Sequence, residues 1–168
     1  MNYRLYSFVA GLYLSDLQKG LQTAHVVSEI ASNYVNLGGK PHPAFQKFTH
    51  WATTDKTIII LNALNQQGVL DAYAAIQQWE RSRVFQEFPF PHALFREDEQ
   101  SMNGMATACG IVLPENIYDT RFYEDPCGNP DRFEHVKLVD GVETVCDVYI
   151  EGTATFDFIK KLKSYRLA

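Results

Sequence analysis

The chain is poor in the features that mark membrane, secreted and nucleotide-loop proteins. It has three cysteines, Cys109, Cys127 and Cys146, and no CxxC pair. An odd count without paired spacing argues against a disulfide framework and favours a reducing, cytoplasmic setting. No run approaches the roughly 18 apolar residues of a membrane span, and the first residues lack the apolar stretch of a secretory signal. The sequence also lacks GxGxxG, Walker A and HExxH motifs, so none of these sites is indicated.

Positive charge is scarce as well. Lysine and arginine number 15 against 20 acidic residues, which gives a net charge of −5. The net charge is +2 over residues 1–60, −11 over residues 61–159 and +4 over residues 160–168. Proteins that coat long nucleic acids usually carry a broad basic face, so duplex binding is excluded. A small phosphate-bearing ligand or a single nucleic-acid end remains compatible with this distribution.

The composition is that of a folded domain. Hydrophobic residues make up 46% of the chain and aromatic residues 13%, which is far too apolar for a disordered protein. A length of 168 residues favours one domain with a sizeable core.

Hydrophobic patterning predicts strands that alternate with helices. We expect strands at 4–14, 56–61, 92–96 and 105–113 and helices at 17–37 and 66–86. Ser15 or Asp16 would cap the first helix, Gly38-Gly39 would end it, and Asn65 would cap the second. Residues 40–55 are predicted to be a loop with at most one helical turn, and 97–104 a polar loop. This order of elements indicates an α/β domain with a mostly buried sheet.

The last third of the chain has a different pattern. Residues 119–131 are rich in turn formers, and Asp140-Gly141 predicts a two-residue type I′ hairpin between strands at 133–139 and 142–150. Thr155 would then cap a short helix at 156–165. Its apolar side, with Phe156, Ile159 and Leu162, is expected to pack inward.

Four segments carry a resemblance to a known family. Residues 16–25 (DLQKGLQTAH) follow the first strand and are similar to the motif DLxMxKGKxAAQ. Trp51 with residues 56–61 (KTIIIL) is similar to a W…KKIVLK strand, and residues 91–97 (PHALFRE) to LPxxLIRD. Residues 97–113 match DAGRTQIAPGTxTVLAI without a gap. In this order and spacing, the motifs resemble those of the type 2 peptidyl-tRNA hydrolases over about residues 3–115.

The resemblance implies a fold and an activity. It implies a three-layer α/β/α domain with a mixed four-stranded sheet over residues 1–115. The hairpin and short helix of residues 116–168 would then be a C-terminal extension packed on the same domain. Members of the family are usually homodimers, and they hydrolyse the ester between a peptide and the 3′ terminal adenosine of tRNA. They need no metal or other cofactor.

The same resemblance implies a set of site residues. Lys19 falls on a catalytic lysine at the start of the first helix, where an ammonium and the helix N-terminus both favour an anion. Glu97 replaces the family's aspartate, unless a shift of one residue places Asp98 there. Either carboxylate would orient Lys19 or polarise a water, and Ser101 and Thr107 would supply hydroxyl groups. The residues expected to contact the ligand are Gly20, Thr23, His25 and Arg96.

Simpler interpretations stand beside each of these. Lys19 is compatible with a solvated first-turn lysine, and residues 97–99 with an acidic surface turn. Ser101 and Thr107 are compatible with ordinary loop and strand positions. His25 and Glu29 share a helix face, but no third metal ligand is evident, so we predict no metal site. Cys109 lies in an apolar strand and is interpreted as a core residue rather than a nucleophile.

The departures from the family leave three functional hypotheses. Leu21 replaces the second lysine of the KGK motif, Glu97 replaces aspartate, and Cys109 replaces a threonine. The first hypothesis is an esterase acting at the 3′ end of tRNA. The second is a catalytically lapsed relative that binds or sequesters an adenosine-like or cyclic nucleotide, as a viral sponge for a nucleotide signal would. The third is an interaction module that uses the acidic middle of the chain and the C-terminal hairpin.

Overall fold

The computed structural model describes residues 2–35, 42–83 and 89–168. The elements in chain order are β1 (Tyr3–Val9), α1 (Asp16–Val35), α2 (Pro43–His50), η1 (Trp51–Asp55), β2 (Thr57–Asn62), α3 (Gln66–Ser82), β3 (His92–Arg96), α4 (Glu99–Met102), β4 (Ala106–Pro114), α5 (Glu115–Tyr118), β5 (Thr120–Tyr123), β6 (Arg132–Val139), β7 (Val142–Ile150), α6 (Ala154–Lys163) and β8 (Arg166–Leu167).

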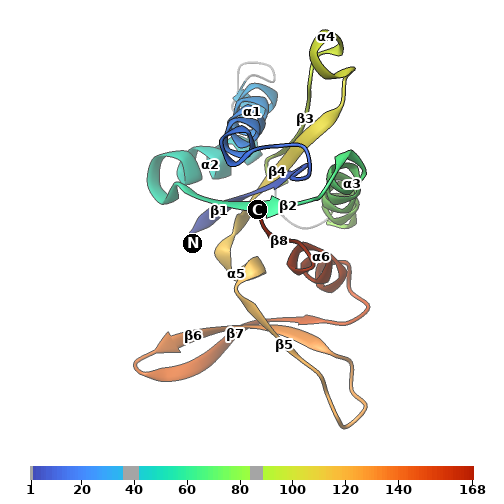
Figure 1. Ribbon diagram of the computed structural model, residues 1–168. Coiled ribbons are helices and arrows are strands. Elements are labelled where there is room, and N and C mark those ends of the chain that lie inside the picture. Colours follow the sequence, from blue (N-terminus) through green and yellow to red (C-terminus); the bar gives the residue numbers. More distant parts are fainter. Residues whose placement is uncertain (1, 36–41, 84–88) are drawn as a thin grey trace.

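The main sheet is mixed, as predicted. Its strand order is β3-β4-β1-β2-β8, with β1 and β2 parallel and β4 antiparallel to both β1 and β3 (Figure 1). The expected four strands are present, but the sheet has a fifth, because β8 pairs antiparallel with the edge strand β2. The short pairing of Leu61 with Leu167 brings the C-terminal end of the chain back to the main sheet.

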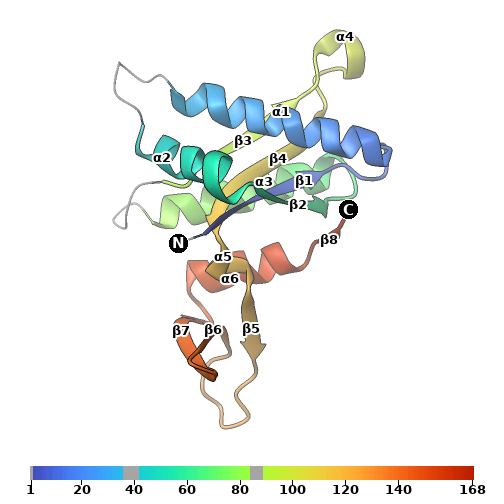
Figure 2. The ribbon, with the colours of Figure 1, turned by 90° about the vertical axis from the view of Figure 1, so that its left-hand side faces the viewer.

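Helices lie against both faces of this sheet (Figures 1 and 2). Side chains alternate along a strand, so successive residues of β1 serve different cores. Leu5 and Val9 pack in a core with residues of α1, α2 and η1. Tyr6 and Phe8 pack in a second core with residues of α3 and α6. Burial on both faces explains why β1 has a nearly continuous apolar sequence rather than an alternating one.

The predicted hairpin is confirmed and belongs to a second sheet. Asp140 and Gly141 both have positive φ, 52° and 81°, as a type I′ turn requires. β6 and β7 pair antiparallel on either side of this turn, and β5 adds a third strand along β6. This small sheet projects from the body on the far side of α6 (Figure 2). α6 packs against α3, and its apolar side is buried as predicted.

Residues 43–55 are helical, so the loop prediction for this segment is wrong. Pro43 stands in the first turn of α2, where its missing N–H costs nothing, and His42 Nδ1 accepts a hydrogen bond from the Ala44 N–H at 3.1 Å. Phe48 and Trp51 are then buried against the sheet. The prolines suggested a loop, but this apolar pair, placed three residues apart, stabilises a helix.

Smaller differences concern the ends of elements. Asn65 caps α3 as predicted, since its side chain accepts from the Gly68 N–H at 3.0 Å. The cap of α6 is Thr153 rather than Thr155, and the segment predicted as turns contains β5. The polar loop after β3 contains the single turn α4. Gly38-Gly39 and the predicted helix end at Gln86 lie outside the described residues.

Candidate functional site

The first turns of α1 present a polar face to the sheet. Lys19, Gln22 and Thr23 share this face, because helical residues three and four apart lie on one side. Gln22 and Thr23 are buried and Lys19 is half-buried. The Thr23 hydroxyl lies 3.0 Å from the Lys19 carbonyl oxygen, to which it donates, and 2.9 Å from the hydroxyl of Ser7 on β1. These contacts fix the start of α1 over β1.

Glu97 is the acidic residue that reaches this face. Its Oε1 accepts a hydrogen bond from Gln22 Nε2 at 2.7 Å and lies 3.1 Å from Thr107 Oγ1. The Thr107 hydroxyl is also 3.0 Å from Gln22 Oε1, so its single proton has two acceptors within reach. Side chains from α1, β4 and the segment after β3 therefore form one closed cluster, and Thr107 is fully buried in it.

The other oxygen of Glu97 is available. Within the described residues, Oε2 has no hydrogen-bond partner, yet it is not among the buried polar atoms that lack one. It is therefore in contact with solvent. A carboxylate held through one oxygen and open at the other is suited to orienting a water molecule or a ligand hydroxyl.

A β-bulge points Thr107 toward α1. In the ladder between β3 and β4, Phe95 pairs with Ala108 and Arg96 with Ala106, so Thr107 is the extra residue. Ala108 packs in the core beneath α1, and Thr107 hydrogen-bonds Gln22 of α1, so two consecutive residues face the same side. Strict alternation would have placed the Thr107 side chain on the opposite face of the sheet. The bulge turns it to the face that α1 covers.

Lys19 lies near this cluster but is not bonded to it. It precedes Gln22 by three residues, or about 5 Å along the helix axis. Lys19 forms an ion pair with Asp16 at 3.0 Å. Within residues 2–35, 42–83 and 89–168 it forms none with Glu97. The Asp16 side chain is 99% exposed and the Lys19 side chain 17%. A carboxylate so fully in water holds an ammonium weakly, so Lys19 remains free to turn toward an anion.

Asp98 and Ser101 bind each other instead of joining the cluster. Asp98 caps α4, and its Oδ1 accepts from the Ser101 N–H at 2.6 Å. The backbone hydrogen bond from Ser101 lowers the pKa of the Asp98 carboxyl below its ordinary value. Both residues are exposed at the tip of the hairpin between β3 and β4. The sequence left Glu97 and Asp98 as alternatives for the site carboxylate. In the structure, Glu97 is the one in contact with α1.

The four residues expected to contact a ligand lie in different surroundings. Thr23 is buried on the side of α1 that faces the sheet. The Arg96 guanidinium donates to the Gly104 carbonyl oxygen at 3.1 Å, on the other face of β3 from Phe95. His25 stacks on Phe95 with ring centroids 4.4 Å apart. Gly20 is exposed, and a Cβ there would meet no atom within 4 Å. The helix surface beside Lys19 is thus bare.

Two residues of this region were not predicted from the sequence: Gln22 on the polar face of α1, and Ser7 on β1 beneath it. Gln22 follows Lys19 by three residues, which places it on the same helix face. Ser7 is the one small polar residue within the buried stretch of β1. Two signals in the sequence could have identified them: Gln22 is a polar residue at helical spacing from Lys19, and Ser7 is a polar residue in an apolar strand.

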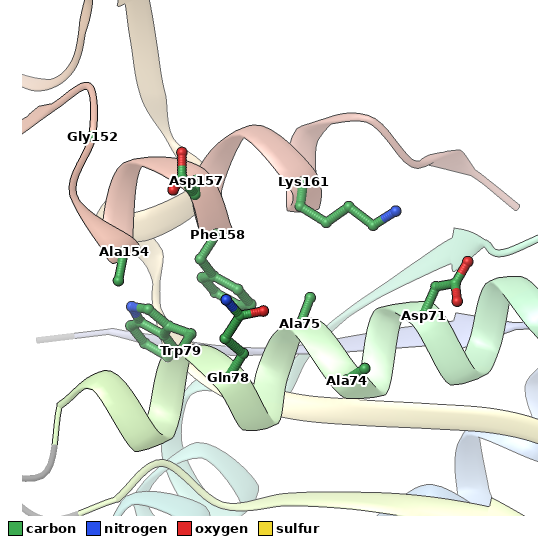
Figure 3. A pocket seen from close by; sticks show the side chains of 10 residues that line it. All are labelled: Asp71, Ala74, Ala75, Gln78, Trp79, Gly152, Ala154, Asp157, Phe158 and Lys161. Atoms are coloured by element: carbon green, nitrogen blue, oxygen red, sulfur yellow. The ribbon is translucent and has the colours of Figure 1, made fainter.

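A further hollow lies away from this cluster. A groove of about 550 Å³ runs between α3 and α6 (Figure 3). Trp79 and Phe158 stack beneath it with ring centroids 4.4 Å apart, and Asp71, Asp157 and Lys161 stand along it. None of the predicted site residues lines this groove.

Comparisons with known proteins leave the family open. No protein-family model matches the chain, and no curated protein matches its sequence. Among the described helices, none combines the length and apolar character needed to cross a bilayer. The described residues also contain no group of three or more side chains able to hold a metal ion. The proposal below therefore depends on the geometry of the cluster around Glu97 and on the sequence resemblance.

Proposed function

We propose that the chain is an esterase that cleaves the bond between an acyl or peptidyl group and the 3′ adenosine of tRNA. The observation that carries the proposal is the fixed carboxylate of Glu97, whose open oxygen lies on the same side of the sheet as the half-buried ammonium of Lys19. The resemblance of residues 3–115 to type 2 peptidyl-tRNA hydrolases supports the substrate class.

The roles follow from the contacts. Glu97 Oε2 orients the attacking water, and Gln22 and Thr107 are positioning residues that hold Oε1. Lys19 leaves the exposed Asp16 and stabilises the negative charge that develops on the ester oxygen. Water adds to the ester carbon, and the bond from that carbon to the ribose oxygen breaks. The ribose oxygen takes up the proton lost by the water, which leaves a carboxylic acid and a free hydroxyl.

The proposal includes the fold and assembly that the resemblance implies. Residues 1–115 would form a three-layer α/β/α domain that works in the cytoplasm as a homodimer without a cofactor. The bare helix surface at Gly20 would admit the terminal ribose beside Lys19. The negative net charge of −5 restricts contact to the tRNA end rather than to its duplex arms.

A second candidate is binding without turnover. It is favoured by the pairing of Lys19 with Asp16, since no contact yet joins the ammonium to the carboxylate of Glu97. Glu97 also replaces an aspartate, and misplacement by about 1 Å costs roughly a hundredfold in rate. In this case the same polar face would hold an adenosine-like or cyclic nucleotide.

One paired experiment separates the two. Hydrolysis of N-acetyl-aminoacyl-tRNA is followed beside thermal-shift titration with adenosine nucleotides and cyclic nucleotides, for the wild type and Lys19→Ala. The esterase proposal predicts turnover that Lys19→Ala lowers about a hundredfold while the melting temperature stays within a few degrees. A nucleotide-induced shift that depends on Lys19, without turnover, would replace it with the binding function. Turnover that Lys19→Ala leaves intact would contradict the proposed role of Lys19.

Lys56→Ala is the matched control. Lys56 is an exposed lysine that forms no ion pair with any described residue, and it lies outside the polar face of α1. Its removal changes the net charge by the same amount and should leave turnover unchanged. Equal loss in both variants would indicate a general effect of charge on tRNA binding instead of a local role for Lys19.

A further inference from the structure

A second hollow combines an open aromatic ring with lysine side chains. It measures about 340 Å³ and lies between β5, β6 and the last turns of α6. Its lining consists of Phe122, Phe133, Lys160, Lys163 and Ser164. The volume falls at the lower end of the range of about 300–1,000 Å³ typical of small-molecule sites. None of the residues assigned to ester hydrolysis takes part in it.

One wall of the hollow is an aromatic ring that is only half covered. Phe133 is 4% exposed, whereas Phe122 is 49% exposed. Their ring centroids are 5.3 Å apart, and Phe156 adds a third ring 6.4 Å from Phe122. Packing on one side thus fixes the Phe122 ring while its other side faces solvent. A fixed aromatic surface binds a flat ring at little cost in side-chain entropy.

Lys163 supplies a cation that the protein itself leaves without a close counter-ion. The side chain is half-buried, and its Nζ donates to the Tyr118 carbonyl oxygen at 2.5 Å. Burial lowers the pKa of the Lys163 ammonium, partly offset by the charge of Asp119. Asp119 is itself paired with Arg4 at 2.6 Å. No ion pair of Lys163 occurs within the described part of the chain; its Nζ also lies 4.9 Å from the Tyr118 ring centroid, and it makes one hydrogen bond of the three it can donate.

Lys160 adds a second cation on the same side of the hollow. Its Nζ lies 6.0 Å from the Phe156 ring centroid, and the described residues give it no ion pair. Residues 160–168 carry a net charge of +4 in a chain whose middle section is strongly acidic. An apolar hollow lined by two lysine side chains, whose ammonium groups can turn toward a bound anion, is complementary to a molecule that is both aromatic and anionic.

We propose that this hollow binds a small aromatic anion, such as an aryl phosphate or aryl carboxylate, with its ring on Phe122 and its charged group between Lys160 and Lys163. Both parts of the ligand are needed. The ring takes the place of solvent on Phe122, and the anion compensates the desolvated ammonium of Lys163.

The test uses phenyl phosphate as the probe and the full-length chain. Binding is followed by chemical-shift titration of the ¹⁵N-labelled protein, with inorganic phosphate and phenol as the two halves of the probe. Phenyl phosphate should bind at least about tenfold more tightly than either half, and the largest shifts should fall on residues of β5 and the end of α6. Inorganic phosphate binding as tightly as phenyl phosphate would overturn the proposal, as would shifts confined to other elements.

Variants then test the two parts of the site. Lys160→Glu and Phe122→Ser should each weaken phenyl phosphate binding about tenfold, and both side chains are exposed enough that the fold is retained. Lys161→Glu is the matched control, because the neighbouring Lys161 makes the same charge change but lines the groove between α3 and α6. Equal weakening by Lys160→Glu and Lys161→Glu would reduce the effect to general electrostatics and contradict the proposal.

Discussion

The carboxylate of Glu97 is positioned by two buried residues, Gln22 and Thr107. Thr107 is fully buried and Gln22 nearly so, yet both are satisfied because they bond each other and Glu97. A buried polar cluster is stable only when its members pair in this way. The methylene by which glutamate exceeds aspartate lets Glu97 reach from the segment after β3 to α1. The cluster thus gives the longer side chain a defined place.

Replacing the buried threonine should separate positioning from substrate contact. Thr107→Val keeps the shape but removes the hydroxyl, so Glu97 retains Gln22 alone. We expect kcat to fall about tenfold with KM little changed, and the free energy of unfolding to fall by about 1 kcal/mol. Ester-hydrolysis kinetics and urea unfolding measure the two effects, and Thr107→Ser should restore most of kcat. A rise in KM alone would instead place Thr107 in contact with the substrate.

Thr120→Val is the control for that stability measurement. Thr120 is also buried, but its hydroxyl has no hydrogen-bond partner among the described residues. Removing an unpaired buried hydroxyl is neutral or stabilising. A loss of stability in Thr120→Val equal to that in Thr107→Val would mean that the cluster contributes nothing specific.

The three cysteines should differ sharply in reactivity. Cys109 is buried in β4, and burial raises the pKa of its thiol far above its ordinary value, whereas Cys127 and Cys146 are exposed. The thiolate is the reactive form, so two thiols per chain should react with Ellman's reagent in the native state and a third only after unfolding. Rapid reaction of all three in the native protein would contradict the core position of Cys109.

At the scale of elements, local rules succeeded where the signal lay within a few residues. Asn65 before α3, the Asp140-Gly141 turn and the strand at 92–96 were predicted from their own residues and are confirmed. The bulge at Thr107 and the strand β8 depend on pairing with distant segments. Whether Lys19 pairs with Asp16 or with Glu97 is likewise decided by three-dimensional placement, and in the structure it pairs with Asp16. No local pattern contains that information.

Two helical glycines offer a matched comparison between elements. A Cβ on Gly68 would lie 1.8 Å from the Ala63 carbonyl oxygen, whereas one on Gly20 would meet nothing within 4 Å. Gly20→Ala should therefore raise the free energy of unfolding by up to about 1 kcal/mol, while Gly68→Ala should lower it by several times that amount. Thermal and urea unfolding measure both. Equal effects of the two substitutions would contradict the described approach of α3 to the residue after β2.

Gly20→Ala also bears on the site. If the bare surface beside Lys19 admits the ribose, the variant should be more stable but less active, with a raised KM. Unchanged kinetics would show that the substrate does not approach α1 at this position.

At the scale of the molecule, the C-terminal third is part of the main core. The cluster beneath α3 and β1 includes six buried side chains from residues 116–168: Ile117, Phe133, Phe156, Phe158, Ile159 and Leu162. β8 adds a strand beside β2. The small sheet, α6 and β8 therefore belong to the same body as the main sheet (Figure 2). The first strand of the chain, β1, and the last, β8, lie in one sheet.

Removing residues 116–168 should prevent stable folding. Each buried apolar side chain of this size contributes roughly 1.5–3 kcal/mol, so losing six is comparable with the whole stability of about 5–15 kcal/mol of a typical domain. We expect residues 1–115 to show no cooperative thermal transition, and a chain that lacks only residues 166–168 to retain one. A cooperative melt of residues 1–115 near that of the full chain would show that the extension is dispensable.

The most direct test of the central claim is the single-turnover rate of N-acetyl-aminoacyl-tRNA hydrolysis by Glu97→Gln. Glutamine keeps the size and the contact with Thr107 but removes the charge that orients water. The account predicts a fall of about a hundredfold or more, with the melting temperature nearly unchanged. Glu99→Gln, an exposed residue two positions along, should retain the full rate. A Glu97→Gln enzyme as fast as the wild type would contradict the assignment of Glu97 and, with it, the proposed active site.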